Sequence, residues 1–214
     1  MKKVLLVLGM ITLLATAGTA QFSFYLIDNF ESGRFNESKW WSFGDLEVLA
    51  EKNGTVEGRD LIAESCGEYA LNLSGPSKEW YVGGIGTDLV VDATEFSRFQ
   101  IDVYGNGNKG GKLLVELFDD DNANFTIEQD SQKNYEPVYD DKWVTEVYIQ
   151  GEGFTRISIP FTAFKDVNPG IGDDKWNPGQ DEGSGGLLKL QIVGISGKRS
   201  SMVDCKIDNL LLTY

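Results

Sequence analysis

The sequence predicts an all-β fold, a closed antiparallel β-sandwich, and two observations indicate it. Short segments rich in β-branched and aromatic residues recur between glycine-rich turns along most of the chain. The two ends carry similar segments, Ile27-Asp28-Asn29-Phe30-Glu31 and Ile207-Asp208-Asn209-Leu210, in which carboxylates interrupt an apolar pattern. We therefore expect the first and last strands to lie side by side and their acidic side chains to share one site.

The first twenty residues have the pattern of an export signal. Lys2 and Lys3 precede an apolar run over residues 4–14, and a stretch of small residues ends at Ala20. A retained membrane anchor is the alternative, but this run is shorter than the roughly 20 residues of a spanning helix. We expect cleavage after Ala20, a bacterial secreted or periplasmic protein, and a single β-sandwich domain over residues 21–214.

The segments that follow the signal have the length and composition of strands. They are 22–27, 47–50, 69–73, 81–85, 99–104, 113–118, 143–149, 155–160, 187–195 and 205–213. Residues 99–104 alternate cleanly between apolar and polar, which predicts one buried and one wet face. The only helix-like segment is a turn around residues 161–165. The connections 119–142 and 167–186 are longer than a hairpin needs, which favours functional loops.

Composition excludes several classes of function. A formal net charge of −14 repels phosphate backbones and anionic membrane surfaces, so we expect neither nucleic-acid binding nor membrane insertion. The absence of histidine excludes Ser-His-Asp triads and histidine-ligated metals. A small two-carboxylate glycosidase or lyase stays open as an alternative, with pairs such as Glu116 and Glu146. Among 33 acidic residues, however, such pairs occur by chance.

The acidic residues include two candidate calcium sites. Residues 119–124 lack the glycine and glutamate positions of an EF-hand loop, and we interpret them as a surface turn, with an irregular ion site as the alternative. Glu31 and Asp208 are the better candidates, because their carboxylates would meet if the terminal strands pair. Carbonyl oxygens of residues 64–67 could complete the shell of such a hard cation.

Two cysteines, Cys66 and Cys205, remain after the signal. In an exported chain the default interpretation is a disulfide, and two buried thiols are the alternative.

Aromatic residues indicate candidate ligand contacts. A sugar ring has apolar faces and a polar rim, so a protein binds it with a flat aromatic surface beside carboxylates or amides. Trp41 and Trp143 are interpreted as structural, because one lies near the first acidic segment and the other begins a strand. The candidate ligand-binding residues are Trp80, Tyr81, Tyr104, Glu116 and Trp176.

Four segments carry a resemblance to a known family: Asp-Asn-Phe-Glu-Ser-Gly at 28–33, followed by a tryptophan, then 67–73, 154–164 and 207–210. With them the chain resembles the galactose-binding-like β-sandwich superfamily. Within it the chain is similar to family 11 carbohydrate-binding modules and complex I intermediate-associated domains. The resemblance implies a jelly roll of two antiparallel sheets, a structural Ca²⁺ held by Glu31 and Asp208, and a glycan bound on a concave sheet face.

We therefore expect a secreted, non-catalytic protein that recognises a polysaccharide or glycan. The alternative is a structural or assembly protein of the cell envelope or extracellular matrix, which would associate with itself or with an envelope protein.

Overall fold

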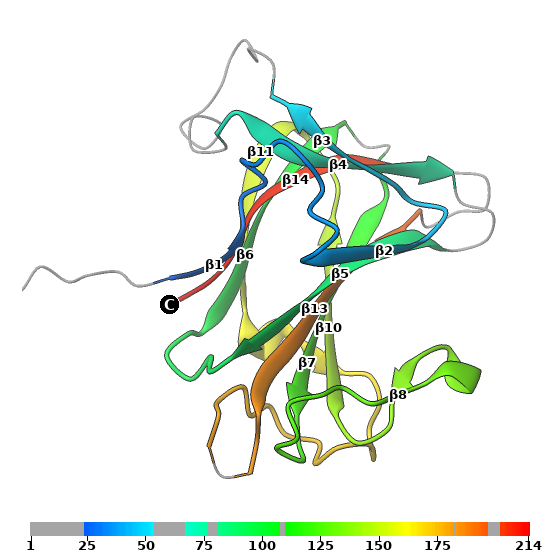
Figure 1. Ribbon diagram of the computed structural model, residues 1–214. Coiled ribbons are helices and arrows are strands. Elements are labelled where there is room, and N and C mark those ends of the chain that lie inside the picture. Colours follow the sequence, from blue (N-terminus) through cyan, green and yellow to red (C-terminus); the bar gives the residue numbers. More distant parts are fainter. Residues whose placement is uncertain (1–23, 54–66, 77–80, 108–109, 182, 197–201) are drawn as a thin grey trace, which may run out of the picture.

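The computed structural model describes residues 24–53, 67–76, 81–107, 110–181, 183–196 and 202–214, and these form two facing antiparallel sheets (Figure 1). Sheet I has the order β11 (Glu152–Pro160), β6 (Arg98–Asn106), β14 (Met202–Thr213), β4 (Tyr69–Pro76) and β3 (Glu47–Lys52), with β1 (Tyr25–Asp28) beside β14. Sheet II has the order β12 (Lys165–Asp166), β10 (Asp141–Tyr148), β7 (Lys112–Asp120), β13 (Gly186–Ile195), β5 (Tyr81–Val91) and β2 (Trp40–Gly44). The predicted β-sandwich is confirmed.

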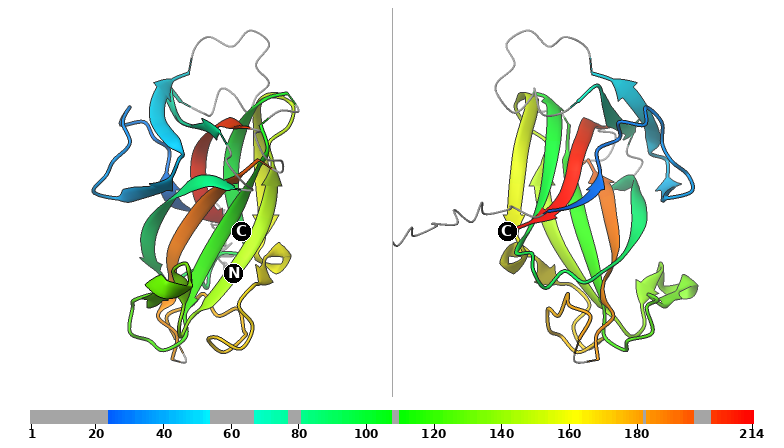
Figure 2. Two further views of the ribbon diagram at one scale, coloured as in Figure 1. Left: turned by 90° about the vertical axis from the view of Figure 1, so that its right-hand side faces the viewer. Right: turned by 60° about the vertical axis from the view of Figure 1, so that its left-hand side comes forward.

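The terminal strands pair as the sequence predicts. β1 runs antiparallel to β14 with Tyr25 opposite Leu212 and Asp28 opposite Leu210. β4 pairs with the earlier part of β14, residues 202–207, so β1 extends sheet I beyond the end of β4. β1 and the C-terminal part of β14 lie side by side in Figure 1 and in the right-hand view of Figure 2. This pairing places the two acidic end segments at one seam of the sandwich.

The core lies between the sheets and follows the alternation of the strands. In β6, Phe99, Ile101 and Val103 face inward, and in β7 Leu113, Val115 and Leu117 do the same. Each fully buried side chain of this size contributes about 1.5–3 kcal/mol relative to an exposed one. The opposite face of each strand is therefore left for polar contacts and ligands.

Strand β2 is the longest strand that sequence reasoning missed. Its sequence, Trp-Trp-Ser-Phe-Gly, is too aromatic and too short for a clear alternation, yet it pairs with β5 along its whole length. Trp40 points into the core and is 2% exposed, while Trp41 is only partly buried. Trp41, which the sequence analysis interprets as structural, instead lies on the outer face of sheet II.

The long connections hold short elements at one end of the sandwich (Figure 2). The β7–β10 connection contains β8 (Gln129–Asp130), the 3-10 helix η2 (Ser131–Lys133) and β9 (Glu136–Pro137). The predicted turn after residue 160 is the 3-10 helix η3 (Phe161–Ala163). Asp119 and Asp120 are fully buried, so the surface-turn interpretation is wrong for these two residues.

Three further predictions concern the export signal, the disulfide and membrane insertion, and they involve residues that are not all described. Residues 1–20, the predicted signal, lie outside them. Cys205 is buried in the core with a free thiol. Its predicted partner, Cys66, lies outside the described residues, and the described structure contains no disulfide at Cys205. In the described ranges, no helix is long and apolar enough to cross a membrane.

Candidate functional site

The outer face of sheet II carries aromatic and polar side chains in cross-strand register. Because Val115 and Leu117 of β7 point into the core, Glu116 and Phe118 point to the other face. One row across the sheet consists of Trp41, Gly86, Gln191, Glu116 and Val144. The next row consists of Phe43, Gly84, Val193, Leu114 and Glu146.

Two rings lie over glycines of β5 at one edge of this face, and we call Trp41 and Phe43 the ring platform. A Cβ atom on Gly86 would lie 2.5 Å from Trp41 Cε2, and one on Gly84 would lie 2.5 Å from Phe43 Cζ. Both rings therefore occupy the space that side chains of β5 would otherwise fill. Glycine in a strand interior is unfavourable by itself, and close approach by another group is a usual reason for it.

Polar side chains continue the face from the ring platform toward β10. Lys189 Nζ lies 5.8 Å from the Trp41 ring and 5.5 Å from the Phe118 ring, within cation–π range. Glu116, 7% exposed, forms an ion pair of 3.4 Å with Lys142. Burial raises the pKa of Glu116, and the charge of Lys142 opposes the rise. The face thus has balanced charge, although the whole chain is strongly acidic.

The β7–β10 connection adds two side chains to the same face. Lys189 Nζ donates to Gln129 Oε1 at 2.9 Å, and Lys142 Nζ lies 3.8 Å from Glu136 Oε1. Gln129 belongs to β8 and Glu136 to β9, which pair with each other. The small two-stranded sheet is therefore attached to the outer face of sheet II through these lysines.

The structure brings only part of the predicted ligand set together. Glu116 lies centrally on the outer face of sheet II, and Tyr81 begins β5 of the same sheet with 40% of its surface exposed. Tyr104 lies in β6 of sheet I, where it packs edge-to-face on Phe154. Trp176 packs against Phe161, Phe164 and Trp143, so its ring serves the core. Trp80 lies outside the described residues.

Sequence reasoning missed the ring platform and the row beside it. The signal that could have indicated them is the segment Gly83-Gly84-Ile85-Gly86, since glycines two apart on one face of a strand leave room for flat groups. The partner rings could not be assigned without the β2–β5 pairing.

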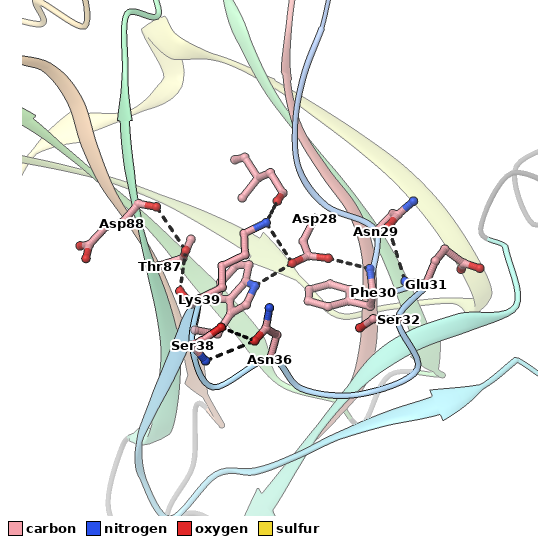
Figure 3. A network of polar contacts seen from close by, with 12 residues as sticks. Asp28, Asn29, Phe30, Glu31, Ser32, Asn36, Ser38, Lys39, Thr87 and Asp88 are labelled. Atoms are coloured by element: carbon pink, nitrogen blue, oxygen red, sulfur yellow. Dashed lines mark hydrogen bonds and ion pairs between the residues drawn. The ribbon is translucent and has the colours of Figure 1, made fainter.

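The second candidate site is the terminal acidic cluster, which we define as Asp28, Glu31, Asp102 and Asp208. Asp28 accepts from Phe30 N (2.9 Å) and from Trp40 Nε1 (2.8 Å), and Lys39 Nζ lies 3.2 Å from it (Figure 3). The Glu31 carboxylate accepts from the backbone N–H groups of Glu68 and Tyr69, both at 3.1 Å. These bonds connect the segment after β1 to β2 and to the start of β4.

Asp208 is the least satisfied member of the terminal acidic cluster. It is fully buried, and its Oδ2 has no hydrogen-bond partner in the described structure. Burial first, and then the negative charges of Asp102, Glu31 and Asp28, raises the pKa of Asp208 to about 8. A buried carboxylate oxygen among other carboxylates fits the ligand set of a hard cation such as Ca²⁺.

Comparison with solved structures finds this fold in carbohydrate-binding modules. The family 11 module of the cellulosomal cellulase Lic26A-Cel5E of Clostridium thermocellum matches with a TM-score of 0.51 and 15% identity, over 90% of this chain and 95% of that one. A family 11 module from Clostridium thermocellum in complex with a β-1,3-1,4-mixed-linked tetrasaccharide gives 0.50 and 15%, over 89% and 95%. An exo-β-agarase gives 0.50 and 13%, over 89% of this chain but 25% of that one.

No protein-family model matches the sequence, and no curated protein is similar to it at a significant level. The structural matches are low in identity and show the fold alone: two facing antiparallel sheets arranged as in the family 11 modules.

Proposed function

We propose that this protein is exported and binds a polysaccharide or glycan on the outer face of sheet II, without catalysing a reaction. The observation that carries the proposal is the ring platform. Two rings lie over the glycines of β5 beside a row of amide, carboxylate and ammonium groups, which is the combination that sugar faces and hydroxyl rims require.

The spacing of the strands gives this face the dimensions of an oligosaccharide site. From Trp41 in β2 to Val144 in β10 the row crosses four strand intervals, about 19 Å at the usual separation of neighbouring strands. Lys142 is paired with Glu116, and the negative charges of Asp88 and Asp140 act on Lys189, so the face suits a neutral chain better than a charged one. The family 11 module in complex with a mixed-linked tetrasaccharide supports this class of ligand.

The proposal also assigns a structural Ca²⁺ to the terminal acidic cluster. Asp208 and Glu31 would hold it, and its charge would compensate carboxylates that the fold buries together. The cation would fasten β14 to the segment after β1.

The test is a binding screen of the purified protein against neutral polysaccharides, starting with mixed-linked β-glucan, by affinity electrophoresis and calorimetry. We expect Trp41→Ala to weaken binding about ten-fold or more, which corresponds to about 1.4 kcal/mol. Tyr104→Ala, on sheet I, is the matched control and should leave the affinity unchanged.

Two results would contradict the proposal. Retention of no glycan, together with concentration-dependent self-association, would favour the envelope assembly protein. Release of reducing sugar, lost on a single change at Glu116 or Glu146, would favour the glycosidase.

A further inference from the structure

A second group of oxygen atoms meets at the end of sheet II, where the end of β7 lies beside the start of β10. Asp119 is the second-last residue of β7, Asp121 follows that strand, and Asp141 begins β10. One carboxylate oxygen of each lies within 4.8 Å of the others. We call these three residues the loop acidic cluster.

Each carboxylate of the loop acidic cluster is held in place by a donor. Asp119 accepts from Trp143 Nε1 at 2.9 Å and from the backbone N–H of Asn177 at 3.0 Å. Asp121 Oδ2 accepts from Asp141 N at 2.9 Å, and Asp141 Oδ2 accepts from Lys175 N at 3.1 Å. These bonds fix the orientation of the carboxylates.

One oxygen in the cluster is left with no partner. Asp141 is fully buried, and its Oδ1 has no hydrogen bond in the described structure. An orphaned carboxylate oxygen in a buried position carries a large desolvation penalty, so it points to a group that the protein alone does not supply. Gly172 borders the same spot, since a Cβ there would collide with Asp121 Oδ2 and Asp141 Oδ1.

The Asn177 carboxamide lies beside the same carboxylates. With its nitrogen toward the cluster, it donates to Asp119 Oδ2 at 2.9 Å and to Asp121 Oδ1 at 3.2 Å. Half a turn of the amide would bring its oxygen to the same place, at about the spacing of neighbouring ligands around one calcium ion, whose metal–oxygen distances are about 2.3–2.6 Å.

Within the described part of the chain, no side-chain cation is paired with the loop acidic cluster. Among the ion pairs of the described residues, none joins a lysine or arginine to Asp119, Asp121 or Asp141. Lys175, the nearest basic residue in the loop, directs its Nζ to Asp173 at 3.1 Å and is mostly exposed. The negative charge is therefore available to a bound ion.

We propose that Asp119, Asp121, Asp141 and Asn177 form a binding site for a divalent cation of the calcium type. All four ligands are oxygens in an irregular arrangement, as hard cations with flexible coordination accept. Asn177 would turn its oxygen edge inward when the ion is bound and its nitrogen edge inward when it is not, which explains how the metal-free cluster is tolerated.

The site connects the two long connections of the fold. Asp121 and Asp141 flank the β7–β10 connection, and Asn177 belongs to the connection before β13. The β7–β10 connection also carries Gln129 and Glu136 to the outer face of sheet II. A cation here would order both loops and, if the proposed function holds, strengthen glycan binding. The cation site itself does not depend on that function.

The test is direct metal binding to chelator-treated protein. Because the Trp143 indole contacts Asp119, Tb³⁺ in the site should be sensitised by tryptophan excitation, and Ca²⁺ should displace it. The measurement is made in an Asp208→Asn background, which removes the terminal acidic cluster as a source of signal. We expect Asp141→Asn to abolish the sensitised emission and Asp181→Asn, an exposed aspartate in the same loop, to leave it unchanged.

Thermal melting provides a second readout. In Ca²⁺, the protein with Asp141 intact should melt higher than its Asp141→Asn variant. In chelator, the difference in melting temperature between the two proteins should disappear or reverse, because Asp141→Asn removes a buried charge. If Asp141→Asn does not fold, the half-exposed Asp121→Asn takes its place in both measurements. Equal Tb³⁺ emission and equal calcium-dependent melting with and without Asp141 would overturn the proposal.

Discussion

Trp41 and Gly86 are cross-strand partners in β2 and β5, and the indole lies over the glycine where a side chain would stand. This pair fixes the orientation of the largest ring on the outer face of sheet II. Since Lys189 Nζ also lies over the same ring, the Trp41 indole is held from two directions.

A side chain on Gly86 should therefore disrupt the site without disrupting the fold. Gly86→Val places branched carbons against the indole, so Trp41 must turn away, and we expect glycan affinity to fall about ten-fold or more. Calorimetry measures the affinity, and tryptophan fluorescence reports the displaced ring. Ser42→Ala, at the residue after Trp41, is the control. Unchanged affinity in Gly86→Val would mean that the ring platform is not the contact surface.

The pH dependence of stability should differ in sign between two glutamates of this face. Burial raises the pKa of Glu116 above its unfolded value of about 4.3, so the folded protein favours the protonated carboxyl. The contribution of Glu116 to stability is therefore complete below the unfolded pKa and is lost as pH rises through the folded pKa. Hydrogen bonds from Lys112 and Tyr148 lower the pKa of Glu146, so its contribution is present above the unfolded pKa and is lost as pH falls through the folded one.

Urea unfolding over this pH range tests both signs. The free energy of unfolding of the wild type relative to Glu116→Gln should decrease as pH rises, and relative to Glu146→Gln it should increase, by a smaller amount because Glu146 is exposed. Parallel curves for the wild type and Glu116→Gln would show that the folded environment of Glu116 does not perturb its titration.

The ion pair between Arg156 and Asp102 should be a major contributor to sheet I. Arg156 donates to both oxygens of the fully buried Asp102, each at 2.8 Å. Arg156→Ala removes this bidentate partner and should lower the free energy of unfolding by about 3 kcal/mol. Arg98→Ala removes only bonds to Ser158 and should cost less than about 1 kcal/mol. Denaturant unfolding measures both variants. Equally small losses of unfolding free energy in Arg156→Ala and Arg98→Ala would contradict the prediction that the buried Asp102 carboxylate depends on Arg156.

Calcium at the terminal acidic cluster can be tested apart from the loop acidic cluster. In an Asp141→Asn background, saturating Ca²⁺ should raise Tm by about 5–10 °C, since a ligand at a hundred times its Kd adds about 2.7 kcal/mol. Asp208→Asn in the same background should remove the shift, and Asp204→Asn, four residues earlier in β14, should retain it. A melting temperature that chelator leaves unchanged would count against this site.

The sequence alone was sufficient to predict the β-sandwich fold and the pairing of its first and last strands. Alternation in residues 99–104 and the apolar segments of the other strands indicated two-sided strands, and the acidic end segments indicated that β1 and β14 pair. It also indicated Glu116 and Asp208 as candidates. Alternation is a local property of the chain, because successive side chains point to opposite faces, and for that reason it can be read without coordinates.

Tertiary structure alone decided which face is the candidate site and which oxygens converge. Trp40 and Trp41 are adjacent and chemically identical, and only the pairing of β2 with β5 sends one into the core and the other onto the glycines. Asp121, Asp141 and Asn177 come together because two long connections fold back on the same end of sheet II. Such contacts depend on the path of the whole chain, which no local pattern encodes.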